Sequence, residues 1–70
     1  MKLSQLIQNL THLLAEEGDI PVLISSDPEG NSYNDLGKQL QVDVTNTRRG
    51  KLALIFPVNQ ISPEALDILP

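Results

Sequence analysis

Cysteine and tryptophan are absent from this sequence, and histidine occurs once, as His12. Without cysteine the chain forms no disulfide and no thiolate metal site, and a single histidine does not make a multi-histidine site. We therefore expect neither a metal nor another cofactor. The lack of cysteine also suits a reducing compartment, so we expect the protein in the cytoplasm.

Long apolar runs and excess positive charge are missing too. The longest apolar run, Leu52–Phe56, is far below the about 20 residues that span a bilayer, and no signal-peptide core opens the chain, so we expect no membrane contact. Five Lys and Arg residues against nine Asp and Glu residues give a net charge of −4. Nucleic-acid binders usually carry a basic stripe, so we expect no nucleic acid, and the scattered acids are too sparse for a DNA mimic.

The chain is also short, and its 70 residues fit one small domain, residues 1–70. A domain of this size buries only about 60% of the surface of its unfolded chain, and its core supplies only about 3–5 kcal/mol. The C-terminal segment 61–69 is more apolar than a free tail. Both features favour self-association, and we expect a homodimer.

Apolar residues at helical spacing open the chain: Leu3, Leu6, Ile7, Leu10, Leu13 and Leu14. This stripe predicts an amphipathic helix over residues 4–17, with Ser4 as its N-cap and Gly18 just beyond its end. His12 lies beside the stripe, and we interpret it as a helix-surface histidine.

Three segments have strand character. Residues 20–25 form a short run rich in β-branched residues, and residues 40–45 alternate apolar with polar side chains. Residues 51–56 are apolar almost throughout, which predicts a central strand covered on both faces. Residues 46–50 predict a hairpin connection between the second and third strands, because Gly50 accepts a positive φ.

A helix start follows near the C-terminus, where Ser62-Pro63-Glu64 supplies an N-cap, a proline at the first helical position and an acid in the first turn. It predicts a short helical turn. The fold class is therefore α+β, in the order α-β-β-β, with one amphipathic helix packed on a three-stranded sheet.

Residues 25–38 are predicted to form a long polar loop of about fourteen residues, against an ordinary length of about 4–6. Asp27-Pro28-Glu29-Gly30 fits a β-turn in which the Asp27 carboxylate bonds nearby backbone N–H groups. A calcium site built on Asp27, Glu29 and Asn31 is the alternative. An EF-hand loop, however, requires glycine and glutamate where Ser32 and Lys38 stand.

Partner binding by this loop is compatible with the turn interpretation. The candidate partner-binding residues are Asp27, Glu29, Asn31, Tyr33 and Asp35. Arg48 and Arg49, at the tip of the expected hairpin, are candidates for binding an anion such as a phosphate.

Three segments carry a resemblance to a known group. They are Leu-Ile-x-x-Leu at residues 6–10, Gly-Asp-Ile-Pro-Val at residues 18–22, and Ser-x-Asp-x-Glu-Gly-Asn-x-Tyr-x-x-Leu at residues 25–36. Together they resemble a group of small uncharacterised bacteriophage and prophage proteins over the first half of the chain. The resemblance implies a phage or prophage origin and implies no activity.

The sequence contains no recognisable set of catalytic residues. Nucleophilic catalysis requires a nucleophile, a base and an orienting group, and the four glycines are too scattered for a phosphate-binding loop. We therefore expect a non-enzymatic protein that interacts with another protein. The alternative is an oligomeric protein that binds a small ligand or nucleotide derivative, with Arg48 and Arg49 on its phosphates.

Overall fold

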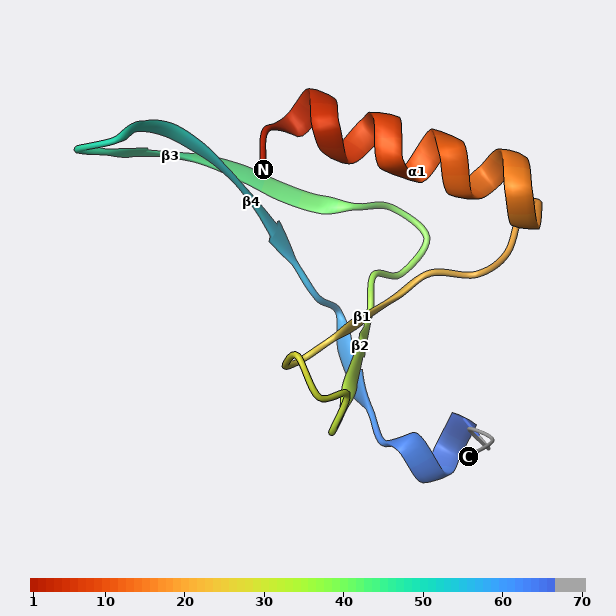
Figure 1. Ribbon diagram of the computed structural model, residues 1–70. Coiled ribbons are helices and arrows are strands. Elements are labelled where there is room, and N and C mark those ends of the chain that lie inside the picture. The colour runs from red at the N-terminus through yellow and green to blue at the C-terminus, as the bar shows by residue number, and fades with distance from the viewer. Residues whose placement is uncertain (67–70) are drawn as a thin grey trace.

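The computed structural model describes residues 1–66 as one helix, five strands and a short 3₁₀ helix (Figure 1). The elements are α1 (Leu3–Glu17), β1 (Leu23–Ser25), β2 (Tyr33–Asp35), β3 (Gln41–Thr47), β4 (Gly50–Phe56), β5 (Asn59–Ile61) and η1 (Pro63–Leu66). The α+β class, the N-terminal helix, the hairpin and the short C-terminal helical turn are confirmed. The arrangement of the strands differs from the expected single sheet.

Helix α1 begins one residue earlier than predicted, at Leu3, and its N-cap lies two residues before the predicted one. Lys2 occupies the N-cap, and its backbone N–H donates to Gln5 Oε1 at 2.7 Å, so the prediction for Ser4 is wrong. Gln5 is the third helical residue, and its side-chain oxygen accepts from the N–H of the N-cap residue, as in one half of a capping box. Gly18 lies directly beyond the end of the helix, as the sequence predicts. It has φ of 82° and donates its N–H to Leu14 O at 2.9 Å.

The predicted long loop over residues 25–38 is wrong, because it contains strand β2. Strand β2 lies between β1 and β5 in an antiparallel sheet of order β1-β2-β5. Tyr33 lies opposite Ser25 on one side and Ile61 on the other. A three-residue polar strand has no recognisable alternation, so pairing with two distant segments decides its conformation.

Strands β3 and β4 form a separate two-stranded antiparallel sheet, so the three predicted strands do not share one sheet. Its register runs from Gln41 opposite Phe56 to Thr47 opposite Gly50, and only Arg48 and Arg49 form the turn. The predicted connection over residues 46–50 was therefore too long. The expected central position of residues 51–56 is wrong for the single chain, because β4 pairs on one edge only.

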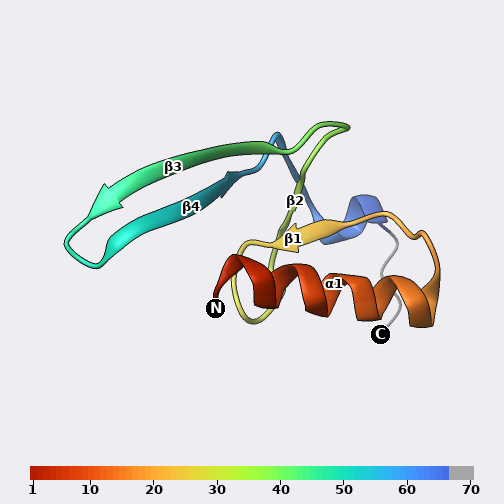
Figure 2. The ribbon, with the colours of Figure 1, turned by 90° about the horizontal axis from the view of Figure 1, so that it is seen from above.

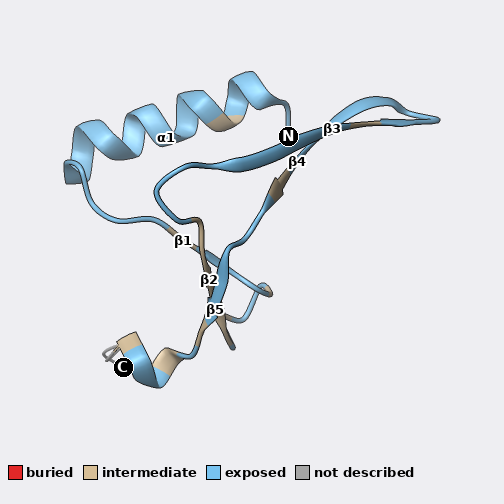
Figure 3. Ribbon diagram, turned by 180° about the vertical axis from the view of Figure 1, so that it is seen from behind, coloured by how far each residue is buried: buried red, intermediate tan, exposed pale blue. Residues whose placement is uncertain are grey.

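No residue between Met1 and Leu66 is buried (Figure 3). The first half of α1 lies above the start of β3 without packing closely on the hairpin, and among residues 1–66 the most extensive contacts between elements join paired strands (Figure 1). The helix was expected to pack on the sheet, but α1 does not pack closely against β3 and β4 of its own chain. The Cα radius of gyration is 14.1 Å, against about 11 Å for a compact 70-residue domain.

Within residues 1–66, none of the helices has the length and apolar character required to cross a membrane. The expected apolar tail over residues 61–69 is described only as far as Leu66, and Ile68 and Leu69 lie outside the described residues.

Candidate functional site

The turn between β1 and β2 is organised by one carboxylate. Asp27 Oδ1 accepts the backbone N–H groups of Glu29 at 2.9 Å and Asn31 at 3.2 Å, and Asp27 Oδ2 accepts from Asn31 Nδ2 at 2.9 Å. Ser25 Oγ donates to the Asp27 carbonyl oxygen at 2.6 Å. The structure thus brings Asp27, Glu29 and Asn31 together in the Asx turn that the sequence indicates.

This hydrogen bonding has an electrostatic consequence. The side-chain amide of Asn31, followed by its backbone N–H, lowers the pKa of Asp27 below the ordinary value of 3.8, because both groups donate to the charged form. The Asp27 oxygens are therefore used within the turn. Among residues 1–66, no three acidic or histidine side chains lie close enough together to hold a metal ion.

Tyr33 and Asp35 lie further along, at the two ends of β2. A Cβ atom placed on Gly30, which has φ of 73°, would lie 3.0 Å from Tyr33 Oη, so the tyrosine side chain covers the glycine. Asp35 Oδ1 accepts the N–H of Gly37 at 2.9 Å, and its carbonyl oxygen accepts from Val58 at 2.7 Å. Each contact stabilises the path of the chain.

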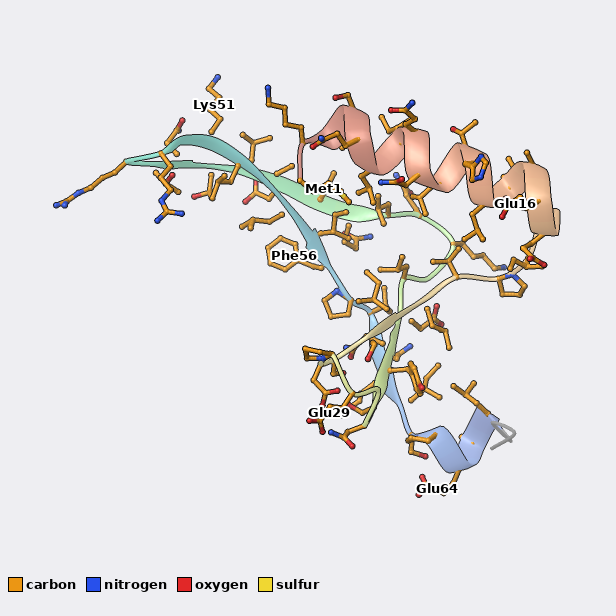
Figure 4. All side chains as sticks on the ribbon, in the orientation of Figure 1. Met1, Glu16, Glu29, Lys51, Phe56 and Glu64 are labelled. Carbon is orange, nitrogen blue, oxygen red and sulfur yellow. The ribbon has the colours of Figure 1, made fainter. Side chains whose placement is uncertain are left out.

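Three of the five basic residues line one pocket. Lys2, Arg49 and Lys51 line a shallow pocket of about 710 Å³ beside the start of α1. Arg48, the other predicted anion-binding residue, does not line this pocket, so the structure separates it from Arg49. In Figure 4, Lys51 lies near Met1, whereas Glu16 lies at the far end of the helix.

An apolar cleft adjoins this pocket and lies between the helix and the hairpin. It measures about 730 Å³, and α1 contributes Leu3, Leu6, Ile7 and Leu10 to it. The hairpin contributes Val42, Val44, Ala53 and Ile55, which lie in two directly opposed pairs on one face of the sheet. We call this the apolar cleft, and we call those four hairpin residues the helix-side face.

Most large apolar side chains around the apolar cleft remain exposed to solvent. Ile7 is 58% exposed, Val42 is 59% exposed and Val44 is 61% exposed. Isolated apolar residues are ordinary at a protein surface, but a contiguous set of this kind marks a contact surface. Sequence reasoning assigned these residues to an internal core, and their amphipathic spacing alone does not show whether the same chain covers them.

His12 is exposed, with 76% of its side chain accessible, as expected of a helix-surface histidine. Its Nε2 lies 2.9 Å from Glu16 Oε1, one helical turn away. Comparisons with known protein families, with curated proteins and with solved structures give no match for this chain.

Proposed function

We propose that the protein is a non-catalytic, cytoplasmic protein-interaction protein of phage or prophage origin, and that its binding surface is the apolar cleft. The observation that carries the proposal is the exposed area. The chain exposes 6413 Å², whereas a compact monomer of 7.7 kDa exposes about 4,300 Å². Each chain therefore exposes about 2,100 Å² more surface than a compact monomer of its size.

The excess is large compared with known interfaces. A standard protein–protein interface removes about 800 Å² from each partner, and obligate complexes remove more. The open surface includes a helix face and a sheet face whose apolar side chains point into one cleft. Such faces are stable only when they are packed against another element, so a protein partner supports both folding and function.

The polar turn has a different part in this proposal. Asp27 and Asn31 hold the turn, and Glu29, whose Oε2 accepts a long hydrogen bond of 3.4 Å from Asn31 Nδ2, is the exposed acidic side chain on it (Figure 4). A partner that contacts the turn would therefore meet Glu29 on a preorganised loop, which costs little ordering entropy on binding.

The experiment introduces a charge into the cleft. With the chain immobilised, Leu10→Asp is expected to lose at least one protein, or the chain's own second copy, that the native chain captures from an expression lysate and that mass spectrometry identifies. The reason is that a carboxylate in an apolar interface loses its hydration without gaining a partner. Leu10 lines the cleft, while its neighbour Asn9 does not.

Asn9→Asp is the matched control, because it adds the same charge to the same turn of the helix outside the cleft. Circular dichroism of both variants should show the same helix content. If both variants capture the same proteins as the native chain, the apolar cleft is not the binding surface.

A second candidate is an oligomeric protein that binds a small anionic ligand or nucleotide derivative. One observation favours it: Lys2, Arg49 and Lys51 line one pocket, next to the N-terminal end of α1. A thermal-shift panel of nucleotides and inorganic phosphate tests this candidate. The midpoint should rise with a bound anion, and the rise should disappear in Arg49→Gln; no rise with any ligand contradicts it.

A further inference from the structure

Strand β4 has a free edge that is not protected against pairing. It is seven residues long, contains no proline, and carries one charged side chain, Lys51. Natural proteins protect open edges with charges, prolines, bulges or a covering element, because an open edge pairs with another strand. A two-stranded hairpin is also only marginally stable in water until further strands join it.

The outer edge of β3 differs at its centre, where one outward-pointing amide is already hydrogen-bonded to an acidic side chain. Val44 N–H donates to Asp43 Oδ1 at 2.8 Å, so that amide points away from β4 and is already satisfied. Pairs in an antiparallel ladder alternate between hydrogen-bonded and non-hydrogen-bonded. Val44 lies opposite Ala53. Because the Val44 N–H points away from β4, these two residues form a non-hydrogen-bonded pair. The N–H and C=O of Ala53 therefore project from the free edge of β4.

We propose that this edge pairs with β4 of a second copy of the chain, antiparallel and centred on Ala53, to form a four-stranded intermolecular sheet. The proposal rests on the proposed function and deepens it by naming the partner of the apolar cleft. A two-fold axis through the Ala53 pair satisfies the edge groups of Lys51, Ala53 and Ile55 in both copies. Such an isologous contact closes at two copies.

The pairing also explains the side chains of β4. Leu52, Leu54 and Phe56 project from one face, while Ala53 and Ile55 project from the other. A strand that is apolar on both faces belongs in the middle of a sheet, and the second copy places β4 there. Phe56 extends from β4 on the side away from α1 in Figure 4.

The position of the helix fits an added strand. Figure 2 shows β3, β4 and α1 in that order across the view, so α1 lies on the side of β4 away from β3. Figure 1 shows the first half of α1 above the start of β3, while the tip of the hairpin extends past the N-terminal end of the helix. A strand that pairs with the free edge would therefore pass beneath the first turns of α1. Each helix then covers strand β4 of the other copy, and the apolar cleft is filled.

The dimensions agree with two copies. Two chains together have an excess area of about 4,200 Å², which lies in the range of obligate homodimer interfaces. The radius of gyration of one open chain, 14.1 Å, equals that of a compact particle of twice 70 residues, about 14 Å. One chain therefore extends over about the volume that a compact particle of twice its length fills, which leaves room for a second copy.

The charges complement each other under the same two-fold axis. Lys2, Arg49 and Lys51 lie at one end of the apolar cleft, whereas Glu16 and Glu17 lie at the C-terminal end of α1. Strand β4 and helix α1 both run away from the basic end (Figure 1). Antiparallel pairing thus brings the basic end of each copy toward the acidic end of the other, which favours this orientation.

Disulfide trapping tests the pairing directly, because the native chain has no cysteine to interfere. In Ala53→Cys the two cysteines face each other across the axis with Cα atoms about 5.5 Å apart, within disulfide range. Mild oxidation should convert most of the protein to a covalent dimer. The matched control is Val44→Cys, whose two Cα atoms lie three strand spacings apart, about 14 Å, and which should stay reduced.

A proline variant gives a second readout. Ala53→Pro removes an N–H that points to the free edge and leaves the intrachain ladder intact, so the dimer dissociation constant in sedimentation should rise at least about tenfold. Asn46→Pro, which removes an outward-pointing N–H from the outer edge of β3 and lies outside the apolar cleft, should leave it within about threefold. Equal cross-linking of the two cysteine variants, or equal weakening by the two prolines, overturns the proposal.

The oligomeric state of the native chain separates this inference from the proposed function. A native dimer that resists trapping at Ala53 overturns the β4 pairing and leaves the proposed function standing. An open monomer that binds only a different protein does the same. A compact monomer with a radius of gyration near 11 Å overturns both.

Discussion

Dilution is the perturbation that most directly tests whether the exposed faces are covered by another copy. For a dimer that unfolds to two chains, each tenfold dilution lowers the free energy of unfolding by about 1.4 kcal/mol. Twice 70 residues unfold with an entropy of about 0.3 kcal/mol per kelvin at about 2.1 cal/mol/K per residue. The thermal midpoint should therefore fall by about 5 °C for each tenfold dilution.

The assay is thermal unfolding followed by circular dichroism from high to low micromolar concentrations, with a path length chosen to keep the signal constant. Over a hundredfold range the midpoint should move by about 9–10 °C, well beyond the scatter of repeated melts. A monomer has a midpoint that does not depend on concentration. An unchanged midpoint over that range, with a cooperative transition, would refute the reasoning from exposed area.

Two further predictions concern the β1–β2 turn. Gly30→Ala should destabilise the protein by about 1–2 kcal/mol for its left-handed backbone, and by more than Gly18→Ala in urea unfolding, because only Gly30 meets Tyr33 Oη. An equal loss in both variants would exclude the crowding. Because the folded-state pKa of Asp27 is lowered, its stabilising effect is present above its ordinary value of 3.8 and is lost as pH falls through the folded pKa. Asp27→Asn should therefore lower stability at pH 7 and flatten the acid-side decline, and a decline as steep as that of the native chain argues against this role of Asp27.

The β1–β2 turn could be predicted from neighbouring residues alone, whereas strand β2 could not. Asp27, Pro28 and Gly30 specify a β-turn through contacts within five residues, and the structure forms the expected hydrogen bonds there. The same loop was expected to lack a strand, because Tyr33-Asn34-Asp35 has neither an apolar alternation nor a β-branched residue. Residues 33–35 form a strand because they pair with β1 on one side and with β5 on the other.

The sequence alone determined the elements whose causes are local: the helix from its apolar stripe, the hairpin from two facing strands, and the C-terminal turn from Ser62-Pro63-Glu64. It also indicated that residues 51–56 require cover on both faces. Tertiary structure alone decided that the strands divide into two sheets and that β4 keeps a free edge beside an uncovered helix. The physical reason is that an apolar pattern specifies which face avoids water and leaves open which surface, in the same chain or in another, will cover it.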